Sequence, residues 1–258
     1  MKILLVADIH YTLPQLDWLT AEAVHYDALI LAGDLLDVSA IASLDAQIVV
    51  MRAYLERLSA LTSLVVCSGN HDLDRTEEGE HVAGWLARCG DIRMCRDGEA
   101  VSIGDTLISS CPWWDGPRVR DAIAAQLARD AARKEAEGLR RWIWAYHAPP
   151  VGSPVSWGGV RHYGDPDLRA WIDSYSPDMV CSGHVHNAPF VPDGAWADRV
   201  GRTWCFNMGK QIGPVPAHIA VETELGEALW FSLEGGQSLA LSTEDAVPTR
   251  LEKAPAWF

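Results

Sequence analysis

The amino-acid sequence has no long hydrophobic run. Near its start, the apolar residues Ile3 to Ala7 are followed directly by Asp8. A membrane-spanning helix needs about 20 apolar residues, and a secretory signal needs an apolar core of roughly 7–15 residues. We therefore expect a cytoplasmic protein that has no membrane partner.

Cysteine is scarce, and its spacing excludes two common kinds of site. No two of the six cysteines have the CxxC spacing of redox motifs and structural zinc sites. Several lie within apolar runs, where a reduced thiol behaves as a small hydrophobic side chain. We expect all six to be free thiols with a packing role: Cys67, Cys89, Cys95, Cys111, Cys181 and Cys205.

Basic residues are also few. The chain has 21 Lys and Arg against 35 Asp and Glu, which gives a formal net charge of -14. Binding to long nucleic acid is normally driven by clustered Lys and Arg, so we do not expect that partner. A small anion can still bind, because bound metal ions can supply the local positive charge.

Internal repeats, low-complexity stretches and linkers rich in Gly, Ser or Pro are absent as well. A chain of 258 residues, of which 48% are hydrophobic, has enough material for one large core. We expect a single domain that spans residues 1–258.

What is present is an alternation of short apolar runs and longer segments of helical period. The first part predicts strand, helix, strand, helix and strand, in residues 2–8, 16–25, 27–34, 41–61 and 63–70. Strands that are apolar on both faces indicate an α/β sheet covered by helix layers. The second part is richer in strand: it has runs at 143–147, 179–184 and 203–207 and an antiparallel hairpin with arms at 218–223 and 228–233.

Side chains that can bind metal ions follow five of these predicted strands. Taken singly, each could be a helix cap, a turn residue or a hydrogen-bonded core residue. The carboxyl ends of strands in an open α/β sheet share one edge, however, and ligand sites lie there. The joint pattern therefore predicts one site, and its members are Asp8, His10, Asp34, Asn70, His147, His184 and His186.

This set of ligands favours certain metals. Aspartate and asparagine oxygens combined with imidazole nitrogens suit Mn, Fe, Zn or Co, whereas an all-oxygen set suits Ca or Mg. Seven ligand side chains are too many for one tetrahedral ion, but they suit two divalent ions that share a carboxylate. Such ions lie roughly 3.5–4 Å apart and hold both the attacking and the leaving oxygens of a displacement at phosphorus.

The order of these motifs resembles the calcineurin-like metallophosphoesterases, and among them the bacterial class III cyclic nucleotide phosphodiesterases. The resemblance implies a four-layer αββα sandwich of two mixed sheets. The motifs are DxH (Asp8, His10), GDxxD (Gly33, Asp34, Asp37), GNHD (Gly69, Asn70, His71, Asp72), a lone His147, and GHxH (Gly183, His184, His186).

The resemblance also implies the role of each residue. A water or hydroxide that bridges the metals would attack phosphorus, and His71 would protonate the leaving oxygen or stabilise its charge. Asp72 would either orient His71 or serve as a turn residue; for Asp37 we favour a helix cap, and Asn207 would brace the rim. One metal would be held by Asp8, His10 and His186 and the other by Asn70, His147 and His184, with Asp34 as the bridge.

Aromatic residues in loops near this edge could contact the substrate. The chain has 12 tryptophans, and an aromatic wall beside a phosphate site could stack on a flat group. Alternatively, the aromatic residues could pack the loops onto the body of the protein, and the arginines could form surface salt bridges. The candidate substrate contacts are Trp113, Trp114, Arg118, Trp157, Arg161 and His162, with Tyr163 in the same segment.

The motifs define the reaction better than the substrate. We expect a small phosphodiester. The alternatives are a phosphomonoesterase or protein phosphatase of the same superfamily, and a non-catalytic metal-binding interaction module with the same fold. The final residues, Trp257 and Phe258, could dock on the body or on a second copy, with a frayed end as the default expectation.

Overall fold

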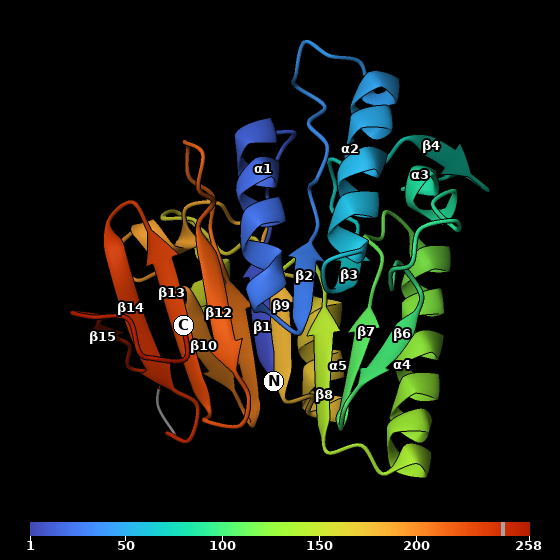
Figure 1. The fold of residues 1–258 in the computed structure, drawn as a ribbon. Coiled ribbons are helices and arrows are strands. Elements are labelled where there is room, and N and C mark those ends of the chain that lie inside the picture. Colours follow the sequence, from blue (N-terminus) through green and yellow to red (C-terminus); the bar gives the residue numbers. More distant parts are fainter. Residues whose placement is uncertain (244–245) are drawn as a thin grey trace.

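The computed structural model describes residues 1–243 and 246–258. Two β-sheets and a set of flanking helices form its body (Figure 1). The first sheet begins with three parallel strands, in the order β1 (Lys2–Val6), β2 (Ala28–Ala32) and β3 (Ser63–Cys67). Each lies within a run predicted as a strand and ends two or three residues before that run does.

Four C-terminal strands extend the first sheet beyond β1, and all of these pairs are antiparallel. They are β12 (His218–Glu222), β13 (Glu227–Ser232), β14 (Gly235–Ala240) and β15 (Thr249–Arg250). The predicted hairpin is the pair β12 and β13. The first sheet is therefore mixed.

The second sheet is also mixed. Its interior strands are parallel neighbours: β7 (Thr106–Ser110), β8 (Arg141–Ala145), β9 (Met179–Ser182) and β11 (Thr203–Asn207). Its edges are antiparallel, formed by β6 (Ala100–Ile103) and β10 (Ala197–Val200). A separate small hairpin consists of β4 (Arg75–Glu77) and β5 (Glu80–Val82).

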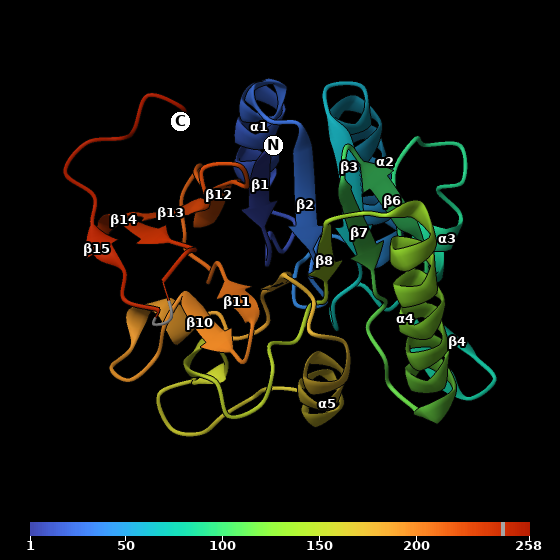
Figure 2. The same cartoon turned by 90° about the horizontal axis from the view of Figure 1, so that it is seen from below.

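Helices cover the outer face of each sheet. The two helices on the first sheet are α1 (Leu13–Glu22) and α2 (Leu44–Ser59), and those on the second are α4 (Pro117–Glu137) and α5 (Pro166–Tyr175) (Figure 2). The short helices are α3 (Gly84–Ala87) and the 3₁₀ turns η1 (Ala23–His25), η2 (Pro154–Ser156) and η3 (Ala188–Phe190). The last turn of the first predicted helix is therefore η1 rather than α-helix.

Local sequence explains where the longer helices begin and end. Ser43 precedes α2, and its hydroxyl accepts a hydrogen bond from the Ala46 amide. Pro117 occupies the first turn of α4, where its missing N–H is not needed. The same helix ends at Gly138, which has φ +65° and so adopts the left-handed conformation that glycine reaches without strain.

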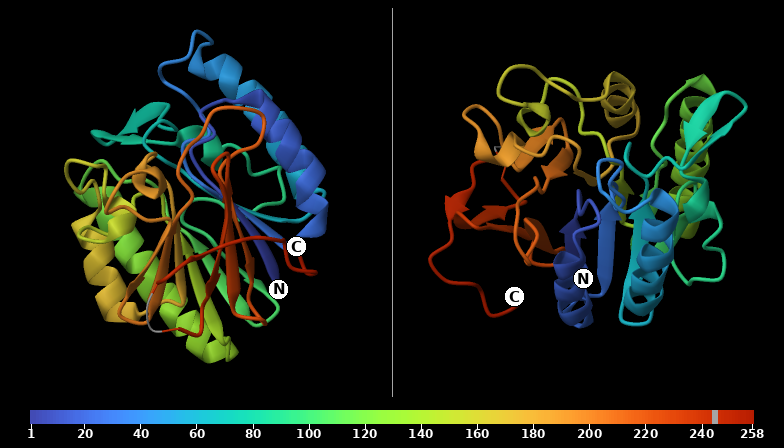
Figure 3. Two further views of the ribbon diagram at one scale, coloured as in Figure 1. Left: turned by 90° about the vertical axis from the view of Figure 1, so that its left-hand side faces the viewer. Right: turned by 90° about the horizontal axis from the view of Figure 1, so that it is seen from above.

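Alternation along the strands produces three apolar layers. Ile3 and Leu5 of β1 face the second sheet, and Leu4 and Val6 face the helices of the first sheet. The left view of Figure 3 shows the helices on opposite sides with the sheets between them. The predicted four-layer αββα sandwich of two mixed sheets is confirmed.

Two further expectations concern single residues. All six cysteines are buried free thiols, as predicted. The C-terminal pair does not fray: the Trp257 indole N–H donates to Glu227 Oε2 at 2.6 Å, and the Phe258 ring stacks on Phe231 at 4.5 Å. Among the described residues, no helix combines the length and the apolar character that crossing a bilayer requires.

Candidate metal centre

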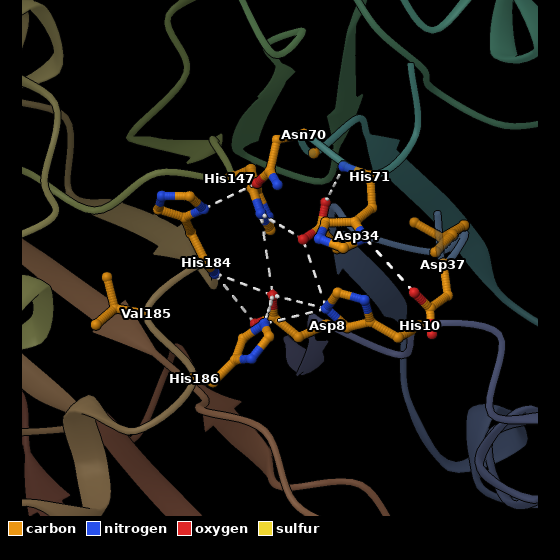
Figure 4. A network of polar contacts seen from close by, with 12 residues as sticks. Asp8, His10, Asp34, Asp37, Asn70, His71, His147, His184, Val185 and His186 are labelled. Atoms are coloured by element: carbon orange, nitrogen blue, oxygen red, sulfur yellow. Dashed lines mark hydrogen bonds and ion pairs between the residues drawn. The ribbon is translucent and has the colours of Figure 1, made fainter. Parts of the chain in front are cut away.

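The residues predicted to bind metal lie together, in the loops that follow the parallel strands of both sheets (Figure 4). Loops after β1, β2 and β3 carry Asp8, His10, Asp34 and Asn70. Those after β8 and β9 carry His147, His184 and His186 (Figure 4). Strand ends of an α/β sheet form such crevices, and here two facing sheets contribute to one crevice.

Four of these side chains form the tighter group. The ligand atoms of Asp8, His10, Asp34 and His186 all lie within 4.8 Å of one another. Nε2 of His10 lies 3.0 Å from Nε2 of His186 and 3.5 Å from Asp34 Oδ2. Nε2 of His186 also lies 3.3 Å from Asp8 Oδ1. Two imidazole nitrogens and two carboxylates thus converge on one small volume.

The other three side chains lie on the opposite side of Asp34. Nε2 of His147 is 3.2 Å from Asp34 Oδ2, the same oxygen that faces His10. Asn70 Oδ1 lies 2.9 Å from Nδ1 of His184, and the ring centroids of His147 and His184 are 5.3 Å apart. Asp34 therefore stands between the two groups, where a bridging carboxylate would have to be.

Hydrogen bonds hold the loops of the two sheets against each other. The amide of His184 donates to both carboxylate oxygens of Asp8, each at 3.1 Å. The Nδ1–H of His147 donates to the carbonyl of Ala32, at 2.7 Å. This second bond assigns the proton of a neutral His147 to Nδ1 and turns a bare Nε2 towards Asp34, as is usual for a histidine that binds metal.

The backbone is strained where the ligands are presented. Asp8, His10, Asp34 and His184 have φ values of 56°, 44°, 54° and 67°. Such left-handed conformations are uncommon for residues other than glycine, and each is unfavourable by about 1–3 kcal/mol. Strain of this kind persists at functional sites when the surrounding structure enforces it.

Glycine permits the closest approaches. A Cβ atom on Gly183 would overlap the Asp8 carboxylate, and one on Gly33, which has φ +87°, would overlap the His147 ring. Both glycines immediately precede a ligand in sequence, in the GDxxD and GHxH motifs. The motif glycines are thus required by close packing between loops.

Electrostatics couples the cluster. Burial alone would lower the pKa of His147, but the neighbouring charges of Asp34 and Asp8 outweigh it and raise that pKa. Burial would raise the pKa of Asp34, yet the neighbouring charge of His147 and the other groups around it together outweigh burial and lower it. For His10 burial dominates and lowers the pKa to about 4. At neutral pH Asp34 is therefore an anion and His10 a neutral donor, whereas His147, with a pKa of about 9, has to release a proton when a metal ion binds.

The donor set fits divalent cations. Nε2 of His147 is buried and makes no hydrogen bond, although a buried polar atom is normally paired. Anionic oxygens and neutral imidazoles surround it, and these are ligands for borderline divalent metals. The side chain of His186 is 41% exposed, so an ion and a phosphate group can reach the cluster from solvent.

His71 lies at the edge of the cluster, but Asp72 does not orient it. The Asp72 carboxylate is buried and accepts the amides of Leu35, Leu36 and Gly69, at 3.0, 2.9 and 2.8 Å. The orienting role is therefore wrong, and Asp72 joins two site loops. The carboxylate beside His71 is Asp37, whose Oδ1 lies 3.7 Å from its Nδ1.

Asp37 also differs from the favoured expectation. Its Oδ1 accepts from the amide and hydroxyl of Ser39, at 2.8 and 2.6 Å, within the loop. The residue that caps α2 is Ser43. Asp37 therefore shapes the loop next to His71, and sequence spacing alone does not separate this role from that of a helix cap.

Of the six candidate substrate contacts, the two adjacent tryptophans lie beside the cluster. The Trp113 ring is 5.6 Å from the His147 ring and 5.2 Å from that of His184. Trp113 and Trp114 both line a hollow that also includes His147 and His184. The indole N–H of Trp114 donates to Tyr146 and Asp165, at 2.8 and 2.9 Å.

The other four candidates have partners in the protein. Arg118 donates to the carbonyl of Glu77 at 3.2 Å and lies 3.8 Å from Glu78, so it supports the β4–β5 turn, and its contact with substrate stays a prediction. The loop at 157–163 holds the remaining three. Trp157 donates to the Pro192 carbonyl, Arg161 stacks on Tyr163, and His162 Nδ1 lies 2.9 Å from the Ser156 hydroxyl.

Other residues support the site although the sequence pattern does not single them out. The Ser68 hydroxyl accepts the Trp113 amide at 2.9 Å and positions that indole. The charge of Lys210 also lowers the pKa of His10, although its effect is smaller than those of burial and of the nearby carboxylates, which raise that pKa. Lys210 follows Asn207, which braces the rim as expected by donating to the carbonyls of Val155 and Val185. The position of Lys210, shortly after the turn at Asn207, is the signal in the sequence that could have identified it.

Two mixed sheets face each other, and a cluster of carboxylates, imidazoles and an amide lies at their shared edge as a candidate metal centre. The family model of the calcineurin-like phosphoesterases matches residues 1–188, and the chain belongs to this family. No curated protein is similar enough in sequence to match the chain.

Solved structures share the fold at low sequence identity. The TT1561 protein of Thermus thermophilus is 14% identical, with a TM-score of 0.57 over 96% of this chain and 98% of that one. A purple acid phosphatase from yellow lupin (Lupinus luteus) is 13% identical, with a TM-score of 0.54 over 96% of this chain and 52% of that one. Both show the same arrangement of layers.

Proposed function

We propose that this protein hydrolyses a small phosphodiester with the help of two divalent metal ions. The observation that carries the proposal is the convergence of Asp8, His10, Asp34 and His186, whose ligand atoms lie within 4.8 Å of one another. Asn70, His147 and His184 complete the set on the other side of Asp34. Mn, Fe, Zn or Co suits these donors.

Bound metal ions would supply an acidified water as the nucleophile and would neutralise the phosphoryl oxygens. The chain supplies the geometry. Asp34 Oδ2 faces both groups of ligands, so it fixes their separation. The hydrogen bonds from His184 to Asp8 and from His147 to Ala32 hold the ligands in place before substrate arrives. A site organised in advance needs little rearrangement during the reaction.

His71 is placed to stabilise charge on the leaving group. Its Nδ1 accepts the Val38 amide at 3.4 Å, which assigns the ring proton to Nε2. Its ring stands edge to face with His10 at 4.5 Å, at the border of the cluster. An Nε2–H there can donate a hydrogen bond to the leaving oxygen and stabilise the charge that develops on it, while Asp37 Oδ1 lies 3.7 Å from the other ring nitrogen.

Charge favours a diester over a monoester. A diester carries one negative charge near neutral pH, whereas a monoester carries nearly two. The cluster already contains two carboxylates, and the whole chain has a net charge of -14. Away from the metal centre, a monoanion is therefore repelled less than a dianion by the acidic chain, whereas at the centre itself two bound divalent ions would attract both.

The test is manganese-dependent hydrolysis of bis(p-nitrophenyl) phosphate, compared with p-nitrophenyl phosphate, after removal of metals with a chelator. We expect activity only with added metal, and a higher kcat/KM for the diester. A higher kcat/KM for the monoester would favour a phosphomonoesterase or protein phosphatase. Bound metal without hydrolysis of either ester would favour the non-catalytic module.

A further inference from the structure

A small aromatic cavity opens beside the metal ligands. It has a volume of about 240 Å³, and it shares His147 and His184 with the candidate metal centre. Its remaining walls include the rings of Trp113, Trp114 and Tyr163. A larger hollow, of about 600 Å³, lies at the amino-terminal end of β3, far from the ligands. The smaller cavity is therefore the one that a substrate bound at the metal centre would reach.

Trp113 forms the boundary between the cavity and the cluster. Its ring lies 5.2 Å from the His184 ring and 5.6 Å from the His147 ring. Its amide is held by the Ser68 hydroxyl, two residues before Asn70. The indole is thus fixed to the same loop that supplies a metal ligand, so its distance from the reacting phosphate is set by the backbone.

The floor of the cavity is locked by its own hydrogen bonds. The Tyr146 hydroxyl and the Trp114 indole both donate to Asp165 Oδ2. The other oxygen of Asp165 caps α5 by accepting the amides of Asp167 and Leu168, at 2.7 and 3.3 Å. These polar groups already have partners, so the floor offers a ligand mainly ring surface.

Tyr163 closes the outer side and is itself supported. The Arg161 guanidinium lies 4.5 Å from the centre of its ring, as in a cation–π contact. The Tyr163 amide donates to the Ser156 carbonyl at 2.9 Å. A Cβ atom on Gly158 would overlap this ring, so the loop is shaped to let the tyrosine lie against its backbone.

We propose that this cavity binds a flat aromatic group carried by the phosphate ester, which makes aryl and nucleobase-bearing esters the substrate class. Pockets for drug-sized ligands have volumes of about 300–1,000 Å³, so about 240 Å³ suits a single ring system. Because the polar edges of the floor are occupied, the cavity selects for a flat apolar face and not for a particular base. The inference rests on the proposed function for the position of the phosphate.

The experiment measures binding and needs no turnover. The manganese-loaded protein is titrated calorimetrically with phenylphosphonate and with methylphosphonate, neither of which has an ester bond to hydrolyse. Stacking on aromatic side chains is worth about 1–3 kcal/mol per base. We expect phenylphosphonate to bind about tenfold more tightly or better. A second pair, adenosine 5′-phosphate and ribose 5-phosphate, tests whether a nucleobase has the same effect.

Substitutions assign the preference to the cavity. Trp113→Ala should reduce the preference for phenylphosphonate to less than about threefold and leave methylphosphonate binding unchanged, whereas Trp113→Phe should keep most of it. Trp18→Ala is the matched control and should keep the full preference for phenylphosphonate. It truncates a tryptophan on α1 whose ring contacts that of His218.

Either of two results would overturn the cavity proposal. One is equal affinity for the two phosphonates, including no binding of either, and the other is a preference that survives Trp113→Ala. These results are separate from the hydrolysis assay. A protein that hydrolyses esters but shows no aryl preference would lose the cavity proposal alone, and one that prefers phenylphosphonate without hydrolysing any ester would lose only the proposed function.

Discussion

Neighbouring imidazoles in this site have different environments and hence different tasks. His10 is nearly fully buried between two carboxylates, with its Nε2 directed into the cluster. His71 is half-buried, and its nearest carboxylate is 3.7 Å away on the outer side. The first arrangement suits a ligand and the second a group that exchanges protons with solvent. The two residues should therefore respond differently to mutation.

Substitution of these residues separates metal binding from proton transfer. Asp34→Asn should greatly reduce both the metal content and the rate, because the shared oxygen loses its charge. His71→Ala should lower kcat by about 10²–10⁴-fold and leave the metal content nearly unchanged. Elemental analysis and steady-state kinetics on the same preparations measure both quantities. Loss of metal from His71→Ala would contradict the role assigned to His71.

His218 makes stability depend on pH. It lies away from the cluster, stacked on Phe231 and Trp18, and burial lowers its pKa from 6.5 to about 4, against a hydrogen bond with the Pro216 carbonyl. Between pH 6.5 and about pH 4, His218 is protonated in the unfolded chain but neutral in the folded one. Its contribution to stability is thus complete above pH 6.5 and is lost as the pH falls from there to about 4, by about 3 kcal/mol.

Urea denaturation from about pH 7.5 to about pH 4.5 measures that loss. His218→Phe keeps the ring stacking and removes the titrating group, so its free energy of unfolding should fall less over this range than that of the native protein. Every other titrating group is the same in both proteins, and their difference isolates His218. Parallel curves would show that His218 is protonated in the folded protein as readily as in the unfolded one.

At the residue scale the sequence predicts side-chain type better than side-chain partner. It places Asp8, His10 and Asp34 at the ends of buried strands, because the change from apolar to polar residues is local. The partner of Asp72 is not predictable in this way. Its carboxylate bonds amides at positions 35 and 36, and such contacts between loops distant in sequence leave no periodic signal.

Strand exits are the elements on which the site depends. β9 ends one residue before Gly183, and a side chain there would overlap the Asp8 carboxylate. Gly183→Ala should therefore separate the loops after β1 and β9, weaken metal binding by about tenfold or more, and destabilise the fold by about 1–3 kcal/mol. Metal titration and thermal unfolding measure these effects.

The control for this substitution is Gly90→Ala. The nearest heavy atom to a Cβ at Gly90 is Arg96 Nη2, at 3.8 Å, which is ordinary van der Waals contact. Both variants lose the conformational freedom of a glycine. They differ in that only the new Cβ at position 183 overlaps a neighbouring side chain. Equal behaviour of the two variants would mean that the loop at 183 shifts without disturbing Asp8.

Elements with strong periodicity are predicted closely, and those fixed by tertiary contacts are not. The strands β1, β2 and β3 and the hairpin of β12 and β13 agree with their apolar runs. The strand-rich expectation for the second part does not include α4 or α5, although Pro and Gly mark both ends of α4. The division of strands into two sheets came from family resemblance, because pairing between distant strands is not encoded locally.

For the whole molecule, a metal ion bound at the candidate centre would clamp the two sheets together. Its ligands come from β1, β2 and β3 on one side and from β8 and β9 on the other. Metal bound only by the folded state, at about 100 times its Kd, adds about 2.7 kcal/mol, which for a chain of this size corresponds to roughly 5–10 °C in Tm. We expect manganese to raise Tm by that amount and a chelator to reverse it.

Calorimetry on metal-loaded and metal-free protein measures this shift. Asp34→Asn should abolish it, while His71→Ala should retain it, because Asp34 faces both groups of ligands and His71 belongs to neither. A shift of equal size in Asp34→Asn would place the stabilising ion elsewhere on the acidic surface.

The net charge of -14 sets expectations for partners. We propose that the protein acts in the cytoplasm on small esters and does not bind duplex DNA. Fluorescence anisotropy with a labelled duplex at low salt should show no binding, since low salt exaggerates any electrostatic attraction. Binding that weakens steeply with added salt would contradict this proposal.

The bonds from His184 to Asp8 join positions 176 residues apart. A ribosome must release nearly three quarters of the chain before both ends of this contact exist, so nascent fragments hold an incomplete ligand set. Any activity that depends on the complete site therefore arises only late in synthesis.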